Sequence, residues 1–460
     1  MPAVPYSRSL TAREVIDGVV TKVLGRFLIL VGAAIVLFLG AVFVHGTVDA
    51  VSGSAARPAR VSPASRTLAH GRRIFRFDTF GDQSFWGGAL QLHRAIAGKK
   101  NGGVGPGVSP KTALSVGLKV DATRIPKRVA AAIKAGKVNL NDPKVTLSLL
   151  KLNAVVGVRG FFRGNRLTSM GLTCAVCHST VDNSFARGIG RRRDGWPNRD
   201  LNVGAIISLA PNKKPLTDLL RVDEPTLNKV LASWGPGKFD AELFLDGKGF
   251  RPDGKSAAAL IPAAFGLGGA NLHTYTGWGS VPYWNAFVAN LEMHGIGNFS
   301  DERLNNPNQF PVAARAGFAH VHHRRDLITS KLAALHLYQL WLPVPHSRHF
   351  NRAAARRGKA IFDGKGRCAS CHMPPTFTDS GWNLHAGQQI CIDNFQSSRS
   401  PTFRYRTTPL RGFVAKRKGG FYHDGRYPTL RAVVDHYDSC FRLGLSAREK
   451  SDLVQYLLGR

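Results

Sequence analysis

Two stretches of the sequence carry the residue pattern Cys-x-x-Cys-His. One is Cys174-Ala-Val-Cys177-His178, and the other is Cys368-Ala-Ser-Cys371-His372. Two thiols three positions apart can reach the two vinyl groups of one porphyrin, and the next residue then offers an imidazole nitrogen to the iron. The pattern therefore predicts two covalently bound c-type haems, with His178 and His372 as axial ligands of the two irons.

A zinc site and a redox dithiol are the alternative uses of such cysteine pairs. A four-cysteine zinc site needs a second Cys-x-x-Cys nearby, and neither motif has one. Neither alternative requires the histidine that follows each pair, so haem attachment is favoured. The two remaining cysteines, Cys391 and Cys440, pair in an oxidising compartment or stay as buried thiols.

The composition is that of a folded protein with an unusual charge. Hydrophobic residues make up 43% and charged residues 20% of the 460 positions, which is typical of globular chains. Lys and Arg number 63 against 29 Asp and Glu, a net charge of +34. The positive charge is spread along the chain and no nucleic-acid-binding motif accompanies it, so we expect no nucleic acid as partner. An anionic membrane surface or an acidic electron-transfer partner fits better.

A long apolar run near the amino terminus predicts a membrane span. Residues 27–44 read FLILVGAAIVLFLGAVFV, without a charged side chain. This run is long enough to cross a bilayer and too long for a typical signal-peptide core. Because bacterial haem is coupled to Cys-x-x-Cys-His outside the cytoplasm, we expect a single-pass inner-membrane anchor with residues 1–26 inside and the bulk of the chain in the periplasm. A signal cleaved near Ala50 or Ala55, giving a soluble periplasmic protein, is the alternative.

The predicted fold class is mainly α, with two cytochrome c-like domains behind the membrane helix. Residues 45–70 are rich in Ser, Ala, Pro and Arg and read as a linker. Residues 71–342 form the first haem domain with an added segment, and residues 351–460 form a carboxyl-terminal cytochrome c domain. Helical spacing and capping residues predict helices over 85–96, 145–156, 283–293 and 326–342, and after Asn351, Thr429 and Ser446.

Several other side chains are candidates for contact with the haems. His93, His273, Met293 and His294 are candidate iron ligands, although a core or surface role is the default for each. Arg191, Arg192, Arg193 and Arg199 follow the first motif and are candidates to neutralise haem propionates, unless they belong to a solvated loop. Trp196 is placed either between the haems or in ordinary packing.

Three features of the sequence resemble the bacterial di-haem cytochrome c peroxidase family, which includes the MauG-type enzymes. The first is two haem motifs about 200 residues apart. The second is the passage LHLYQLWLPVPHSRHFNRAAARRGKAIFDGKGRCASCH, where a helix ends at a proline linker and a Gly-Lys-x-x-Phe helix leads to the second motif. The third is PLRGF at 409–413, followed by GGFYHDGRYPTLRAVVDHYD. The resemblance is specific over 326–458, thin over 174–325 and absent before 160.

The resemblance implies that electrons pass from the carboxyl-terminal haem to a reactive haem at His178, which reduces peroxide or oxidises another protein. It implies a small electron-donor protein or a membrane redox partner, and in many family members a calcium ion. The family's second haem takes a Met or Tyr ligand before the Pro-Leu-Arg turn, where this chain has Phe403-Arg404-Tyr405. Tyr405 is the first candidate sixth ligand and His423 the second, and an open position is the third. The family's distal glutamate is not identifiable, so no catalytic residue is assigned.

The predicted function is thus a membrane-anchored, periplasmic, peroxidase-like di-haem oxidoreductase. A di-haem electron-transfer cytochrome without its own substrate is the alternative.

Overall fold

The structure is a computed structural model and describes residues 62–460. The expected membrane span at 27–44, the segment 1–26 before it and most of the predicted linker lie outside these residues. From residue 62 onward, the structure contains no helix that combines the length and the apolar character needed to span a bilayer.

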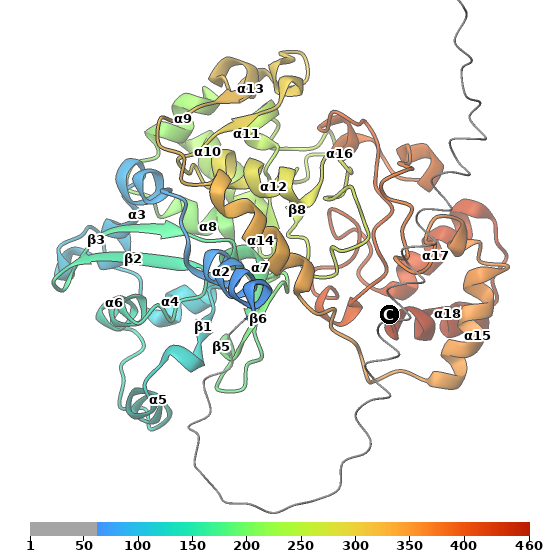
Figure 1. Cartoon of the computed structure of the whole chain (residues 1–460), viewed down its shortest axis with the longest axis horizontal. Coiled ribbons are helices and arrows are strands. Elements are labelled where there is room, and N and C mark those ends of the chain that lie inside the picture. Colours follow the sequence, from blue (N-terminus) through green and yellow to red (C-terminus); the bar gives the residue numbers. More distant parts are fainter. Residues whose placement is uncertain (1–61) are drawn as a thin grey trace, which may run out of the picture. The chain divides into compact units, whose positions relative to one another are not determined.

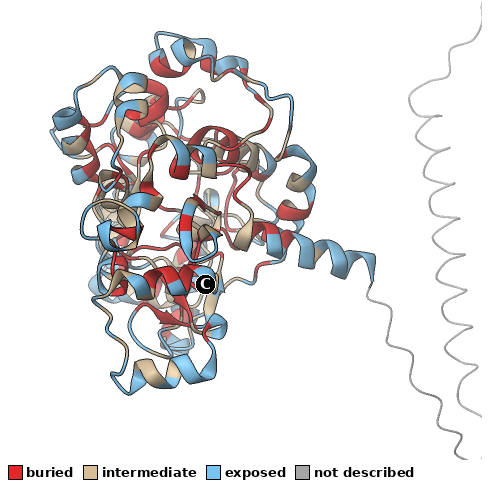
Figure 2. Cartoon of the chain, turned by 90° about the vertical axis from the view of Figure 1, so that its left-hand side faces the viewer, coloured by how far each residue is buried: buried red, intermediate tan, exposed pale blue. Residues whose placement is uncertain are grey.

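The predicted linker over 45–70 extends too far, because a helix begins inside it. Helix α2 runs over Pro63–Phe77, and Ser62 caps its first turn by accepting a hydrogen bond from the Ser65 amide at 3.2 Å. The first turns of α2 are exposed, as Figure 2 shows, while Ile74 and Phe75 near its end are buried. The apolar stripe that reveals this helix begins only at Leu68, so the Ser-, Pro- and Arg-rich composition before it indicated a loop.

Helix α2 packs against α14 (Thr329–Trp341), as Figure 1 shows. A side chain at Gly71 would place its Cβ 1.9 Å from the carbonyl oxygen of Ala334, so only glycine fits at this contact. The second half of α2 is thereby held against α14, the helix that ends at the proline-containing linker 343–345.

The added segment before the first motif consists of short helices and one hairpin. The hairpin pairs β2 (Val158–Arg163) with β3 (Arg166–Leu172), and Val158 lies opposite Leu172. The Thr173 amide donates to the Gly157 carbonyl at 3.0 Å, so the hairpin ends directly at Cys174. The other elements are η1 (Ser84–Ala89), α3 (Leu92–Ala97), η2 (Lys99–Asn101), α4 (Pro110–Ser115), β1 (Val120–Asp121), η3 (Ala122–Arg124), α5 (Lys127–Lys134) and α6 (Pro143–Lys151).

The middle of the chain surrounds the first motif with short elements. The largest core of the described residues, which includes Leu231 and Trp234, lies between this part and the added segment. The elements are α7 (Ala175–His178), β4 (Ser179–Val181), β5 (Ile189–Gly190), β6 (Arg192–Asp194), α8 (Val203–Ser208), α9 (Lys214–Leu220), α10 (Glu224–Trp234), β7 (Lys238–Phe239), α11 (Leu243–Asp246), β8 (Ala259–Leu260), α12 (Val281–Phe287), η4 (Val288–Glu292), β9 (Phe299–Ser300), η5 (Glu302–Asn305), α13 (Pro311–Ala316) and β10 (His320–Val321).

The carboxyl-terminal part forms as its capping residues predict. Asn351, Thr429 and Ser446 each accept a hydrogen bond from an amide in the first turn of the helix that follows. Helices α15 and α18 pack closely, and a Cβ at Gly358 would lie 2.1 Å from the Asp452 carbonyl oxygen. The elements are α15 (Arg352–Asp363), η6 (Cys368–Ser370), η7 (Gly387–Ile390), α16 (Phe395–Ser398), η8 (Phe413–Ala415), α17 (Leu430–Phe441) and α18 (Ala447–Leu458).

The described chain is mainly helical, in agreement with the predicted fold class, and its sheets are all two-stranded. Three predicted helices differ in detail. The one expected over 145–156 is α6, which ends at Lys151, and Val155 pairs with Val120 in a β-bridge. The one expected over 85–96 is divided at Gln91, whose φ of 58° ends η1 and starts α3. The one expected over 283–293 changes from α12 to the π-helical turn η4 at Val288. The division into two cytochrome c-like domains stays a prediction.

A buried ion cluster joins the carboxyl-terminal segment to the middle of the chain. The Arg399 side chain is fully buried and donates from Nε to Asp246 Oδ2 at 2.7 Å, and its Nη1 lies 2.9 Å from Asp240 Oδ1. Gln396 donates to Glu242 Oε1 at 2.9 Å beside it. The guanidinium is therefore the cation that allows buried carboxylates to stay together.

Replacing Arg399→Met should lower the free energy of unfolding by about 3–5 kcal/mol, because it leaves buried carboxylates without their cation. Urea denaturation followed by circular dichroism measures this change. Arg404→Met is the matched control, since Arg404 is exposed. Equal unfolding midpoints for the two variants would contradict the role given to the cluster.

Candidate haem attachment sites

Each motif forms about one helical turn that brings its cysteines and histidine together. In the first motif, on α7, the His178 amide donates to the Cys174 carbonyl at 3.1 Å. In the second, which begins with η6, the His372 amide donates to the Cys368 carbonyl at 2.9 Å. Residues three and four positions apart share one side of such a turn. All four thiols are free, as attachment to a porphyrin requires.

The two histidines are held in the same way by different parts of the chain. The Nδ1 atom of His178 lies 3.0 Å from the Pro262 carbonyl oxygen, and that of His372 lies 3.1 Å from the Phe377 carbonyl oxygen. A carbonyl accepts a hydrogen bond only from a protonated Nδ1, which leaves Nε2 unprotonated with its lone pair available to a metal. Burial lowers the pKa of each imidazole to about 4, so both are neutral at pH 7.

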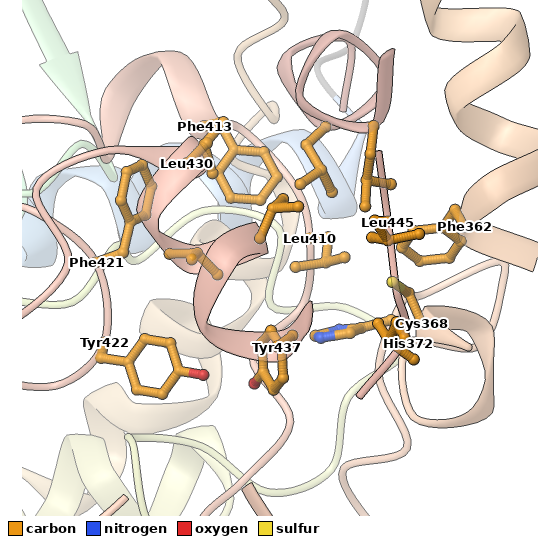
Figure 3. Close-up of a pocket in the computed structure, with 15 residues that line it drawn as sticks. Phe362, Cys368, His372, Leu410, Phe413, Phe421, Tyr422, Leu430, Tyr437 and Leu445 are labelled. Atoms are coloured by element: carbon orange, nitrogen blue, oxygen red, sulfur yellow. The ribbon is translucent and has the colours of Figure 1, made fainter. Parts of the chain in front are cut away.

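An apolar cavity adjoins the second motif (Figure 3). It holds about 740 Å³ of space not filled by atoms, part of it open to solvent. The residues that line it come from α15, the motif, the Pro409–Leu410 turn, η8 and the segment after it, α17, the loop after α17 and α18: Phe362, Cys368, His372, Leu410, Phe413, Phe421, Tyr422, Leu430, Val433, Val434, Tyr437, Leu443, Leu445, Leu453 and Leu457. An apolar wall that includes one thiol and one neutral imidazole fits a covalently attached porphyrin.

Two tyrosines that the sequence did not single out lie at this cavity. Figure 3 shows Tyr422 and Tyr437 on the same side of the cavity as the His372 ring. Burial raises the pKa of Tyr437 to about 12, so its phenol is neutral. The Tyr422 hydroxyl is buried beside Tyr437, and burial raises its pKa as well. These two phenols are the hydroxyl groups among the residues that line the cavity at His372.

The predicted sixth ligands Tyr405 and His423 do not line this cavity. The Tyr405 hydroxyl donates to the Asp393 carbonyl at 2.8 Å, and its ring stacks on His423 with centroids 5.4 Å apart. Burial lowers the pKa of His423 to about 4. The structure thus places the two candidates against each other rather than beside His372.

The first motif has a buried acid beside it that sequence reasoning missed. Glu292 ends the π-helical turn η4, a conformation frequent at functional sites, and neither of its carboxylate oxygens has a hydrogen-bond partner. Burial, reinforced by Glu242 and Asp240, raises its pKa well above the ordinary value. After burial, Glu292 is the cause of the raised pKa of Cys177, which places the carboxyl group near that thiol. In the sequence, the signal for Glu292 was a single acidic residue within the largely apolar run VANLEM.

Of the candidate ligands for the first iron, Met293 and His294 lie next to Glu292. Met293 belongs to the same buried cluster as Ala175 of the motif, and His294 stacks on Phe85 with centroids 3.6 Å apart. His273 lies elsewhere, with Nε2 2.9 Å from the Ala270 carbonyl oxygen. His93 is half-buried with Nδ1 unpartnered.

The arginines after the first motif have separate roles. Arg192 pairs with Asp121 at 3.2 Å, and Arg193 lies over the Trp196 ring at 4.7 Å from its centroid. Arg191 is exposed. Only Arg199 is both buried and without an acidic partner among the described residues, so it alone remains a candidate for a propionate.

One group of side chains among the described residues has donor atoms close enough for a metal ion: Cys371, Asp379 and His385, within 4.8 Å of one another. The thiol belongs to the haem motif, and His385 Nε2 lies 3.0 Å from Asp379 Oδ2. Calcium prefers oxygen ligands, so this group is not a calcium site. The calcium ion stays a prediction without assigned ligands.

Cys391 and Cys440 form a disulfide, the first of the two alternatives left open by the sequence. It joins the turn after η7 to α17, which contributes Tyr437 to the cavity. The bond therefore restrains one wall of the second site.

The double variant Cys391→Ser, Cys440→Ser should lose roughly 4 kcal/mol of unfolding free energy, from the entropy of the 49-residue loop that the bond closes. Urea denaturation of the haem-loaded protein measures the loss, and thiol titration verifies the change. An unchanged midpoint would show that the disulfide does not restrain the unfolded chain.

No model of a known protein family matches the chain. Over a 121-residue alignment it is 35% identical to the methylamine utilization protein MauG of Methylorubrum extorquens, which covers 23% of this chain and 34% of MauG. The match thus spans about a third of the length of that relative.

Two solved structures show weak likeness. One is a MauG-like protein associated with microbial copper homeostasis, 18% identical, with a TM-score of 0.31 over 47% of this chain and 76% of that one. The other is hydrazine synthase of Kuenenia stuttgartiensis, 16% identical, with a TM-score of 0.25 over 48% and 86%. These TM-scores are too low to establish a shared fold.

The sequence match is a line of evidence separate from the two motifs and from the geometry around their histidines. The resemblance of this chain to the MauG-like members of the bacterial di-haem cytochrome c peroxidase family is therefore confirmed.

Proposed function

We propose that this chain is a di-haem c-type oxidoreductase of the peroxidase-like kind. The observation that carries the proposal is the matched pair of sites, each with two free thiols and a neutral histidine whose Nε2 is left available. His178 holds the reactive iron, and His372 holds the iron that receives electrons. When bound, haem supplies a redox-active iron that can accept peroxide and store electrons.

The two sites differ in a way that supports this division of roles. Reduction of hydrogen peroxide to two waters consumes two protons and two electrons, so the reactive site needs a group that delivers protons. Glu292 is the buried acid near Cys177, and burial raises its pKa, which favours the protonated form of the carboxyl group. The cavity at His372 is lined by apolar groups, two phenols, a thiol and the imidazole. The carboxyl group close to that motif, Asp379, lies 3.0 Å from His385 Nε2, whereas neither oxygen of Glu292 has a hydrogen-bond partner.

A basic surface groove next to the second site supports an acidic electron donor. Its lining includes Arg352, Arg356, Lys359 and Arg460, with Phe350 and Tyr456 as aromatic neighbours. These residues belong to α15, to α18 or to the positions directly before and after these helices. The same two helices contribute residues to the His372 cavity. Charge complementarity of this kind speeds the encounter with an acidic protein.

We further propose a periplasmic location with an inner-membrane anchor at residues 27–44. The disulfide between Cys391 and Cys440 supports an oxidising compartment. The anchor rests on the apolar sequence alone, and a cleaved signal is its alternative.

The absorption and electron paramagnetic resonance spectra of the ferric protein test the proposed function. We expect one high-spin signal that changes on addition of peroxide and is altered in His178→Ala, and a second signal altered in His372→Ala. Mass spectrometry should show two attached haems in each variant, because the thiols remain. Two low-spin haems that do not respond to peroxide would instead establish an electron-transfer cytochrome without a substrate.

Replacing Glu292→Gln should slow the reaction with peroxide by roughly 10²-fold or more, since proton transfer by a positioned acid contributes about that much. Stopped-flow absorbance measures the rate at unchanged haem content. Glu302→Gln is the matched control, because Glu302 is exposed at 73% of its side chain. Equal rates in the two variants would remove Glu292 from the proton path.

A further inference from the structure

Four cationic side chains lie near one another: Arg199, Arg406, Arg411 and Lys416. Lys416 Nζ lies 5.5 Å from the centroid of the Phe265 ring, and a Cβ at Gly419 would lie 3.7 Å from Arg199 Nη1. The pKa of Lys416 is lowered to about 7, first by burial and then by Arg406, Arg199 and Arg411. The residues are therefore close enough to repel one another.

None of these four cations has a negatively charged partner among the described residues. The Arg199 side chain lies in a residue only 8% exposed, and its Nε and Nη1 atoms have no acceptor. Arg406 donates from Nη1 to the Leu272 carbonyl at 3.0 Å, but its Nε has no acceptor. Lys416 Nζ has the Pro409 carbonyl at 3.5 Å. Within residues 62–460, no ion pair joins any of the four to a carboxylate, and Arg411 donates to the Pro375 carbonyl at 2.9 Å.

Buried cations without a counter-ion are costly, and several side by side are more so. A folded protein retains such a group where an anion from outside the polypeptide completes it. The guanidinium of an arginine pairs with both oxygens of a carboxylate, so two arginines and a lysine are a fitting set for one or two carboxylates.

The position of the cluster indicates which carboxylates these are. The residue before Arg199, Asn198, donates its amide to the Cys177 carbonyl at 2.8 Å. Next to Pro409, whose carbonyl faces Lys416, Leu410 lines the cavity at His372. Tyr275, whose carbonyl accepts a hydrogen bond from the Arg406 backbone amide at 2.9 Å, donates its hydroxyl to the Leu260 carbonyl, two residues from the Pro262 carbonyl that holds His178. The cluster thus adjoins both predicted haems.

We propose that Arg199, Arg406 and Lys416 form an internal carboxylate-binding site that receives a haem propionate. This inference rests on the proposed attachment of haem at the two motifs and assigns the cations that hold its anionic edge. The site also gives the cations a redox role, because positive charge next to a haem favours the reduced form. Removing one cation should make reduction of the haem that carries this propionate about tenfold less favourable. This change lowers the reduction potential of that haem by about 59 mV for a one-electron couple.

Spectroelectrochemical titration of the purified haem-loaded protein tests the site, with each haem followed by its own absorbance band. The variants are Arg199→Gln, Arg406→Gln and Lys416→Gln. Arg404→Gln and Arg417→Gln are matched controls, since both residues are exposed neighbours in the same segment. Lys416→Arg keeps the charge and should keep the wild-type potential, which separates loss of charge from loss of folding.

A lowered reduction potential at one haem in the three test variants, with unchanged potentials in the control variants, would support the site and identify the haem that carries the propionate. Lowered potentials at both haems would show that the cluster serves a propionate from each. Wild-type potentials in all three variants would overturn the site while leaving the proposed function intact. Wild-type protein without covalent haem would overturn the proposed function and this inference together.

Discussion

At each motif, one hydrogen bond to the histidine ring determines whether that ring can bind a metal. A histidine that follows two cysteines is a useful metal ligand only if its ring is neutral and turned with one nitrogen free. The Pro262 and Phe377 carbonyls impose both conditions, from positions 84 and 5 residues away in sequence. The loop that carries Pro262 must therefore be held firmly against α7, and the burial of both imidazoles depends on the packing around them.

That packing joins parts of the chain that are distant in sequence. Arg399 reaches back to Asp240 and Asp246, and α2 lies along α14 in Figure 1. The added segment before the first motif ends in the β2–β3 hairpin, whose end leads directly into Cys174. These contacts fix the orientation of the short, irregular elements around the first site, where few helices are long enough to be stable alone.

The distribution of charge follows from the same arrangement. The chain carries a net charge of +34, and a small group of its acids lies in the interior, where Asp240 and Asp246 pair with Arg399 and Glu242 and Glu292 lie close by. The cations without a carboxylate partner, Arg199, Arg406 and Lys416, form a separate group. In the proposed function, the buried acid suits proton delivery and the group of cations suits a raised haem potential.

The sequence by itself determined the two thiol pairs with their histidines, the helix caps at Asn351, Thr429 and Ser446, and the mainly helical class. Those features depend on spacing within about one turn of chain, which is local information. Only the tertiary structure decided that Glu292, Tyr422 and Arg199 lie at the sites, that Cys391 pairs with Cys440, and that Tyr405 stacks on His423 instead of lining the cavity. Each of these depends on which distant segments pack together, and burial then gives a common side chain an altered charge state that its sequence neighbours do not reveal.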